Sequence, residues 1–134
     1  MSEEHKNIRI MVVDNKAAMR VKLIKLLLEL GFNKDNIVQF ENGKHALNQL
    51  KISSKKFDLV LSDWNMPTLN GIEFLKHVRA SNLYFRKIPF VLITTVSEKD
   101  KVVEAILFQV NGYLLKPLEM PKLKETLDSI YKIA

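Results

Sequence analysis

The sequence predicts an α/β domain in which five parallel strands form one sheet with helices on both faces. The first observation behind this prediction is an alternation along the chain. Short apolar runs alternate with longer stretches in which apolar residues recur every three or four positions. The second observation is that the runs are largely apolar throughout, as strands buried on both faces are. Five strand–helix pairs in succession indicate a parallel sheet joined by right-handed crossovers.

The expected strands are the five apolar runs, Ile8–Val13, Ile37–Glu41, Phe57–Ser62, Phe90–Thr95 and Gly112–Leu115. A helix is expected after each strand, because apolar residues then follow at helical spacing. In chain order these residues are Val21, Ile24 and Leu28; Ala46, Leu47 and Leu50; Ile72, Leu75 and Val78; Val102, Val103, Ile106 and Val110; and Leu123, Leu127 and Ile130. Polar stretches at 33–36 and 53–56 are expected loops.

The length of 134 residues leaves room for one domain with a sizeable core. We expect that domain to occupy residues 8–134, after a flexible polar leader at residues 1–7. The chain has no cysteine, which excludes disulfides and thiolate metal sites. Because no apolar segment is long enough to cross a membrane and no signal peptide is visible, we expect a cytoplasmic protein without a membrane partner.

The formal net charge of the chain is +6 at pH 7, and a basic balance can mark a nucleic-acid-binding protein. Here the Lys and Arg residues are spread over several expected helices, and no aromatic residues lie between them for base stacking. We therefore expect no nucleic-acid partner. The positive charge is interpreted as a solvated surface, with a functional acidic partner as the alternative.

Three of the apolar runs end at a charged side chain. Asp14 follows the first run, Asp63 follows the third, and Lys116 follows the fifth and precedes Pro117. A charge placed where a core strand ends lies at the rim of the core, partly desolvated, on a rigid support. Because ligands of open parallel sheets bind beyond the carboxyl ends of the strands, these residues predict a functional site.

These residues, with Thr94, Met66-Pro67 and Gly71, resemble the receiver domain of two-component response regulators. The resemblance covers nearly the whole chain and points to the single-domain chemotaxis regulators of the CheY type. It implies a doubly wound, flavodoxin-like sheet with the strand order 2-1-3-4-5. In that order Asp14 and Asp63 end neighbouring strands, about 5 Å apart in backbone spacing. The closer resemblance rests on Val12-Val13-Asp14, Met19-Arg20, Leu30-Gly31-Phe32, Ala46-Leu47, Ser62-Asp63-Trp64-Asn65-Met66-Pro67 and Asn111-Gly112-Tyr113.

The resemblance implies an acceptor and a metal site. Asp63 would be the phosphoacceptor, whose carboxylate attacks a phosphoryl group and forms an acyl phosphate. Asp14, Asp63 and the backbone carbonyl of Asn65 would hold Mg²⁺, which prefers oxygen ligands and keeps several waters. The alternatives from local structure are that Asp63 caps the next turn and that Asp14 is the N-cap of the first helix.

The resemblance also implies three supporting side chains. Lys116 would pair with the acceptor and then with a phosphoryl oxygen, and a cis peptide before Pro117 would aim it. Thr94 would bring its hydroxyl to the phosphoryl group, and the ring of Tyr113 would turn inward when that hydroxyl moves. The alternatives are a strand-end lysine that reaches to solvent and packing roles for Thr94 and Tyr113.

The chain departs from the family pattern at the first strand end. The family usually has two consecutive acids there, whereas this chain has Asp14-Asn15 followed by Lys16. Asn15 can orient a water but adds no charge, and Lys16 can place an ammonium near the pocket. We therefore expect these two modulating residues to weaken Mg²⁺ binding. Ala17 stands where a hydroxyl often caps the helix, which predicts a looser helix start.

Two further departures lie in the last third of the chain. Thr95 is bulkier than the Ala or Gly often found there, so we expect it to hinder access to the pocket. Phe108-Gln109-Val110 replaces a typical Ala-Gly pair and the residue after it. We expect the loss of glycine to remove the left-handed cap of the fourth helix. We also expect these residues to impair an output surface framed by the end of that helix.

The leading interpretation is a stand-alone phosphorylation switch that receives its phosphoryl group from a histidine kinase with Mg²⁺. The family signals through the fourth helix, the fifth strand and the fifth helix. The expected partners are a flagellar motor switch protein or a phosphatase, or the chain acts as a phosphate sink; a monomer is expected. One alternative is a pseudo-receiver binding module with weak or no phosphorylation. A remote alternative is an aspartyl-phosphate phosphatase, which Asn65 argues against because it stands where such enzymes have a second acid.

Overall fold

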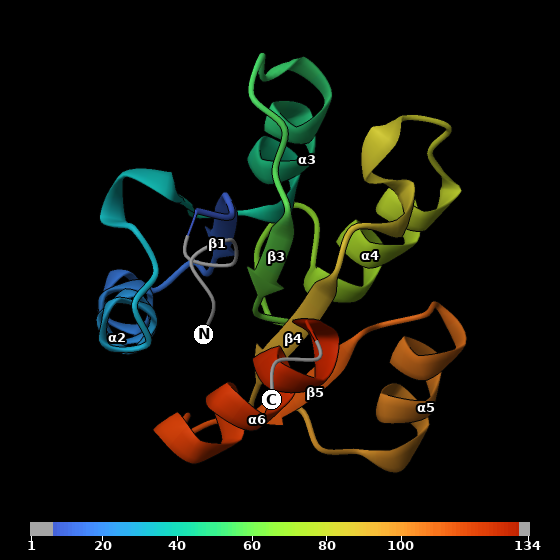
Figure 1. Cartoon of the computed structure of the whole chain (residues 1–134). Helices are drawn as coiled ribbons and strands as arrows, with labels where there is room; N and C mark the ends of the chain where they lie inside the picture. Colours follow the sequence, from blue (N-terminus) through green and yellow to red (C-terminus); the bar gives the residue numbers. More distant parts are fainter. Residues whose placement is uncertain (1–6, 132–134) are drawn as a thin grey trace.

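The computed structural model describes residues 7–131, and the predicted sheet is confirmed within them (Figure 1). All strand pairings are parallel, and the strand order is β2-β1-β3-β4-β5. The strands are β1 (Ile10–Val13), β2 (Ile37–Phe40), β3 (Leu59–Ser62), β4 (Phe90–Thr94) and β5 (Gly112–Leu115). The predicted leader falls almost wholly on residues 1–6, which lie outside the described part. Its last residue, Asn7, accepts a hydrogen bond from the Asn36 side chain through its carbonyl.

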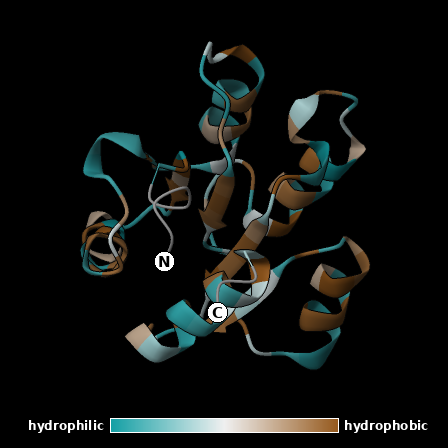
Figure 2. Ribbon diagram, in the orientation of Figure 1, coloured by the Kyte–Doolittle hydropathy of each residue, from teal (hydrophilic) through white to brown (hydrophobic). Residues whose placement is uncertain are grey.

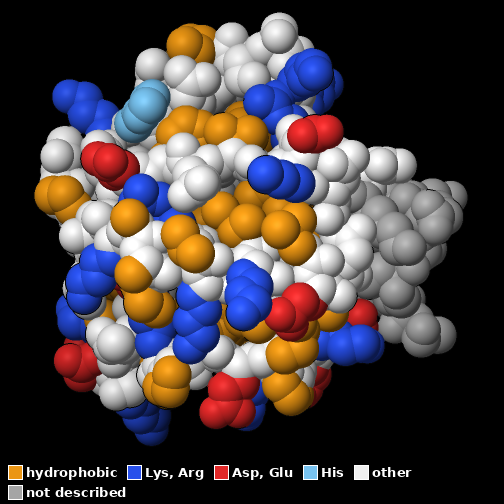
Figure 3. Space-filling model, turned by 90° about the vertical axis from the view of Figure 1, so that its left-hand side faces the viewer, with side chains coloured by type: hydrophobic (Ala, Val, Ile, Leu, Met, Phe, Trp, Pro, Cys, Tyr) orange, Lys and Arg blue, Asp and Glu red, His pale blue; other side chains and the backbone are white. Residues whose placement is uncertain are grey.

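The helices cover the sheet in two layers, with α2 and α6 on one face and α3, α4 and α5 on the other (Figure 1). The α-helices are α2 (Ala17–Glu29), α3 (Gly43–Ile52), α4 (Gly71–Ala80), α5 (Lys99–Leu107) and α6 (Met120–Tyr131). Two short 3₁₀ helices, η1 (Lys34–Asn36) and η2 (Tyr84–Lys87), precede β2 and β4. The strands are apolar while the loops are mostly hydrophilic, so the core lies along both faces of the sheet (Figure 2). On the side of the molecule shown in Figure 3, Lys and Arg side chains are spread among acidic and apolar ones.

Strand register places the predicted site residues at one edge of the sheet. Val13 of β1 pairs with Ser62 of β3, so the next residues, Asp14 and Asp63, leave the sheet side by side. The backbone continues this pairing, because the Asp63 N–H donates to the Val13 carbonyl at 2.9 Å. In the same way the Lys116 N–H donates to the Thr94 carbonyl at 2.9 Å. The cis peptide expected between Lys116 and Pro117 is present.

Four of the strands are shorter than their apolar runs by one or two residues. The first two residues of the expected runs do not belong to β1 and β3. Here the Arg9 N–H donates to the Asp58 carboxylate at 2.8 Å, and the Asp58 N–H donates to the Arg9 carbonyl at 2.8 Å. A side chain therefore replaces part of the ladder at the start of these strands.

The start of α2 agrees with the sequence-based expectation, whereas the end of α5 does not. Lys16 is the N-cap of α2 and no side chain caps that helix, as Ala17 led us to expect. The expected loss of the left-handed cap after α5 is wrong, because Gln109 itself adopts that conformation with φ 63°. The Gln109 N–H donates to the Ile106 carbonyl and the Val110 N–H to the Ala105 carbonyl. These are the two bonds of a Schellman motif, formed here without glycine.

Candidate functional site

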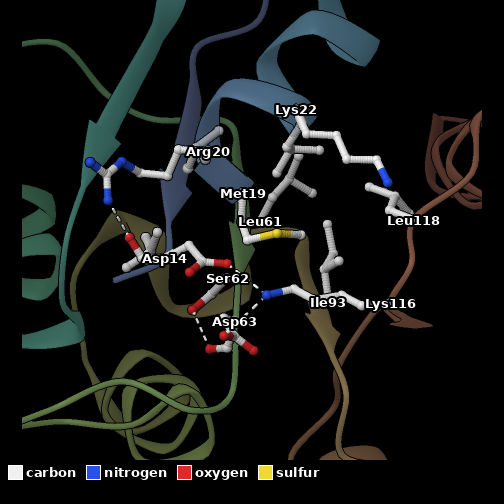
Figure 4. Close-up of a pocket in the computed structure, with 13 residues that line it drawn as sticks. Asp14, Met19, Arg20, Lys22, Leu61, Ser62, Asp63, Ile93, Lys116 and Leu118 are labelled. Carbon is white, nitrogen blue, oxygen red and sulfur yellow. Dashed lines mark hydrogen bonds and ion pairs between the residues drawn. The ribbon is translucent and has the colours of Figure 1, made fainter. Parts of the chain in front are cut away.

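The three charged strand ends meet at the carboxyl edge of the sheet (Figure 4). The Lys116 ammonium lies 2.8 Å from an Asp14 carboxylate oxygen and 3.2 Å from an Asp63 carboxylate oxygen. All three side chains are about nine-tenths buried. Two carboxylates therefore share one ammonium in a partly desolvated setting, where charge interactions are stronger than in water.

Both the carboxylate and the backbone carbonyl of Asp14 form hydrogen bonds. One of its carboxylate oxygens faces Lys116, and the other accepts a hydrogen bond from the Lys16 N–H at 2.9 Å. Its carbonyl accepts a hydrogen bond from the Arg20 guanidinium. Because Lys16 is the N-cap residue of α2, the alternative in which Asp14 caps this helix is wrong.

Asp63 is fixed by its neighbour and by a close approach of α4. The Asp63 carboxylate accepts a hydrogen bond from the Trp64 N–H at 2.7 Å, while its other oxygen faces Lys116. The Gly71 N–H donates to the Trp64 carbonyl at 2.8 Å. A Cβ atom at Gly71 would collide with the Asp63 carbonyl oxygen. The glycine after Met66-Pro67 thus lets α4 begin directly against the loop that follows Asp63.

An open cleft of about 540 Å³ lies over Asp63. Asn15, Lys16 and Thr95, which were predicted to modulate the site, line it together with Asn65; all four are exposed. The remaining lining residues are Met19, Lys22, Asp63, Lys116 and Pro117. The cleft is therefore lined by three lysines, of which Lys16 and Lys22 are exposed, and by a single carboxylate, a setting that favours an anionic ligand.

Lys22 and Met19 were not among the site residues predicted from the sequence, although Met19 was one of the residues that carry the family resemblance. They lie three positions apart on α2, and residues at that spacing share one helix face. Both also line the small cavity that lies beside Asp14 and Lys116 (Figure 4). The sequence feature that could have indicated them is that α2 begins shortly after Asp14, so its first turns lie next to the site.

Thr94 and Tyr113 lie near the site but do not form a hydrogen bond with Asp63 within residues 7–131. Thr94 is fully buried at the end of β4, and its hydroxyl accepts a hydrogen bond from the Val96 N–H at 3.3 Å. The Tyr113 hydroxyl donates to the Val96 carbonyl at 2.6 Å. Both side chains are thus joined to the same residue of the β4–α5 loop.

Tyr113 makes an aromatic contact with Trp64, the residue after Asp63. Its ring lies edge-on to the Trp64 ring, with centroids 6.4 Å apart. Burial, and then the charges of Glu98 and Asp63, raise the pKa of Tyr113 to about 12. The phenol is therefore neutral at physiological pH and can donate its hydrogen bond to Val96.

The donor set fits a magnesium ion rather than a softer metal. In the described part of the chain, no group of three or more His, Cys, Asp or Glu side chains could hold a metal. Mg²⁺ needs only one or two protein carboxylates, because it keeps several of its waters. Asp14 and Asp63 supply two where they meet Lys116, and Asn65 lines the cleft over Asp63. A cation there would compete with the Lys116 ammonium for the same oxygens.

Comparison with known proteins identifies the family. Residues 10–128 match the model of the response regulator receiver domain. The chain belongs to this family. It is 39% identical over 128 residues to chemotaxis protein CheY-3 of Vibrio cholerae, covering 96% of this chain and 95% of that protein. It is 36% identical to chemotaxis protein CheY of Pseudomonas aeruginosa, covering 92% and 96%. The chain is therefore a CheY-like response regulator, as the resemblance implied.

Solved structures agree with the fold. The chain is similar to the chemotaxis response regulator CheY4 of Vibrio cholerae, with a TM-score of 0.79 and 27% identity over 92% of this chain and 98% of that one. It is also similar to a structure of a CheX–CheY–BeF3–Mg complex from Borrelia burgdorferi. There the TM-score is 0.81 and the identity 20%, over 92% of this chain and 89% of that one. The second likeness supports the fold alone.

Proposed function

We propose that this receiver domain is a phosphorylation switch in which Asp63 accepts the phosphoryl group. The observation that carries the proposal is the Lys116 ammonium shared between two buried strand-end carboxylates. That arrangement supplies a nucleophile and a positive charge at the floor of a cleft rimmed by lysines. A histidine kinase, or a small acyl phosphate, is the proposed donor.

The contacts of Asp63 suggest how the phosphoryl group would be transferred to it. A carboxylate oxygen of Asp63 attacks phosphorus, and the bond from phosphorus to the donor breaks in line with it. The electron pair leaves with the donor atom, which is the imidazole nitrogen of a phosphohistidine. Lys116 then exchanges its contact with the Asp63 oxygen for one with a phosphoryl oxygen. The Trp64 N–H holds the Asp63 carboxylate in place meanwhile.

Asp14, Asp63 and the Asn65 carbonyl are the residues that would hold Mg²⁺. When bound, this ion supplies positive charge that offsets repulsion between the carboxylate and the phosphoryl oxygens. The neutral Asn15 and the cationic Lys16 lie in the same cleft, so we expect weaker Mg²⁺ binding than in receivers with two adjacent acids. Thr95 is exposed in that cleft and is proposed to restrict access of water to the acyl phosphate.

The output of the switch is proposed to run through Val96. Thr94 would turn toward the phosphoryl group and give up its contact with the Val96 N–H, which loosens the loop that also holds Tyr113. The surface formed by α5, β5 and α6 would then change its conformation. A partner can favour one state only by binding it more tightly than the other.

The names of the relatives support chemotaxis as the setting. A flagellar motor switch protein or a phosphatase is the proposed downstream partner, with a phosphate sink as the other role. We propose that the chain works as a cytoplasmic monomer that relays phosphoryl groups rather than as an enzyme. In the described residues no helix has the length and apolarity needed to span a bilayer.

A pseudo-receiver that binds partners without phosphorylation is the second candidate. The lysine-rich mouth of the cleft favours it, because Lys16 and Lys22 offset the charge that would attract a cation. Intact-protein mass after incubation with acetyl phosphate and Mg²⁺ separates the two functions. We expect one added phosphoryl group in the parent and none in Asp63→Asn. Equal labelling of both proteins would refute Asp63 as the acceptor, and no labelling of either would favour the pseudo-receiver.

A further inference from the structure

The C-terminal ends of α4 and α5 lie at the right side of Figure 1, away from the carboxyl ends of the strands. A second cleft lies between these two helix ends. It has a volume of about 500 Å³. Because the helices run antiparallel to the strands, this end of α4 and α5 lies far from the strand ends that carry Asp63. The cleft is lined by Lys76, Arg79, Ala80, Arg86, Lys87, Leu107, Phe108 and Gln109. Four of these eight side chains are cationic and none is acidic.

Arg79 makes the cleft rigid. Its guanidinium donates to the carbonyls of Arg86, Ile88 and Gln109 at 2.8 to 2.9 Å, and to the Asn111 side-chain oxygen at 3.0 Å. These acceptors come from the segments before β4 and before β5. One side chain of α4 therefore ties together both other walls of the cleft, and a preformed site loses less entropy when it binds.

The charge of Arg79 is not neutralised by a carboxylate. All four of its acceptors are uncharged, and its Nε atom is buried without a hydrogen-bond partner. Burial lowers the pKa of this guanidinium, which is the effect of desolvating a cation that has no counter-ion. A partner carboxylate at this cleft would supply the missing opposite charge.

The other cations of the cleft leave most of their charge free. Lys76 pairs with Glu104 at 2.7 Å and lies 4.9 Å from the centre of the Phe108 ring. Arg86 and Lys87 are exposed, and within residues 7–131 neither forms an ion pair. Three positive charges therefore face the cleft without a carboxylate partner.

Apolar side chains complete the cleft on the α5 side. Leu107 is 74% exposed and Phe108 is 37% exposed. Together with the cations they fit a ligand that is acidic and carries an apolar group. A nucleic acid is a poorer fit, because base stacking needs open aromatic faces, and Lys76 covers the one ring here.

Phe108 and Gln109 are also two of the positions where this chain departs from its family. The Phe108 ring contacts Lys76 of α4, and the Gln109 carbonyl accepts from Arg79 of α4. The departures therefore shape the α4–α5 side. The expectation that they also impair the α5–β5–α6 output surface stays a prediction.

We propose that this α4–α5 cleft is a second docking surface, which binds an acidic segment of a partner protein through its carboxylates and an apolar side chain. The segment's carboxylates pair with the exposed Arg86 and Lys87, where the charge of Arg79 adds to the attraction, and its apolar side chain covers Leu107. Binding here leaves the Asp63 cleft open, so one molecule can engage this partner while it exchanges phosphoryl groups.

The test uses the full chain and a short fluorescein-labelled peptide in which Glu and Asp alternate with Leu and Phe, followed by fluorescence anisotropy. The charge reversal Arg86→Glu with Lys87→Glu is expected to weaken binding by at least about tenfold. Leu107→Ser is expected to weaken it by about fivefold. The matched reversal Lys44→Glu with Lys51→Glu, on α3, changes the net charge equally and should alter affinity by less than about twofold.

Two probes of the parent separate the proposal from its competitors. A peptide with Ser in place of Leu and Phe should bind more weakly, and single-stranded DNA should not compete. Amide shifts on peptide binding should gather at Arg86 to Ile88 and Leu107 to Asn111. Equal weakening by the α3 reversal, competition by DNA, or shifts around Asp63 instead would each overturn the proposal. Phosphoryl labelling at Asp63 is measured separately, so failure of this proposal and failure of the phosphorylation switch are distinguishable.

Discussion

Each end of the sheet has a partly buried cation, but the groups that surround the cation differ between the two ends. At the carboxyl end, Lys116 is placed between the carboxylates of Asp14 and Asp63. At the other end, Arg79 is surrounded by backbone carbonyls and the Asn111 side-chain oxygen, all uncharged. The first cluster has an excess of negative charge that a metal or a phosphoryl transfer can use. The second has an excess of positive charge and holds the fold together.

The largest effect that tests this difference is expected at Arg79. Arg79→Met would leave the carbonyls of Arg86, Ile88 and Gln109 without their donor, in a partly buried setting. Since hydrogen bonds to charged groups contribute the most and a buried acceptor left unpaired is costly, we expect the free energy of unfolding to fall by about 3 kcal/mol. Urea denaturation followed by circular dichroism measures this change.

The matched control for that variant is Lys87→Met. Lys87 is exposed and forms no ion pair within residues 7–131, so its loss should change stability by no more than about 0.5 kcal/mol. If Arg79→Met cost as little as Lys87→Met, Arg79 would not be the structural tie between α4, β4 and β5.

The second effect concerns the carboxyl end and its charge balance. Asn15→Asp restores a carboxylate to the cleft over Asp63, and we expect it to tighten Mg²⁺ binding by about tenfold. Trp64 is next to the acceptor, and its N–H contacts the Asp63 carboxylate, so its fluorescence reports the titration. An unchanged midpoint would mean that Asn15 does not weaken Mg²⁺ binding as we propose, and Lys16→Ala would then be the informative variant.

The smallest effect compares two helix ends with the same hydrogen bonds. After α2, Gly31 has φ 97° and forms a Schellman motif; after α5, Gln109 forms the same motif with φ 63°. A side chain in the left-handed region is strained. Gln109→Gly should therefore raise the free energy of unfolding by about 1 kcal/mol, and Gly31→Ala should lower it by about as much. Thermal unfolding of both variants checks the signs, and a loss of stability in Gln109→Gly would show that its side chain matters more than its backbone strain.

The carboxyl end was predictable from the sequence because its chemistry is attached to strand ends. A charged residue after an apolar run can be recognised in the sequence alone. The register of a parallel sheet then brings Asp14, Asp63 and Lys116 together. The strand order, however, came from the family resemblance and not from periodicity. Lys22 was missed because it belongs to a helix face, where a lysine is ordinarily solvent-exposed.

The other end could not be read from the sequence. The acceptors of Arg79 are mainly backbone carbonyls, which every residue has, so nothing in the sequence indicates which ones it will contact. Gln109 was expected to disrupt the helix end, because the rule for left-handed caps favours glycine. The rule states a preference of about 1 kcal/mol, and the tertiary contacts of α5 and β5 outweigh it.

The most direct test of the account is the chemical location of the phosphoryl group. The protein is incubated with acetyl phosphate and Mg²⁺, reduced with sodium borohydride, which converts an aspartyl phosphate to an alcohol, and analysed by peptide mass spectrometry. We expect the reduced side chain at Asp63, and we expect Lys116→Met, which removes the shared ammonium, to leave much less of it. Reduction at Asp14, or none at either aspartate under conditions in which another receiver domain is labelled, would contradict it.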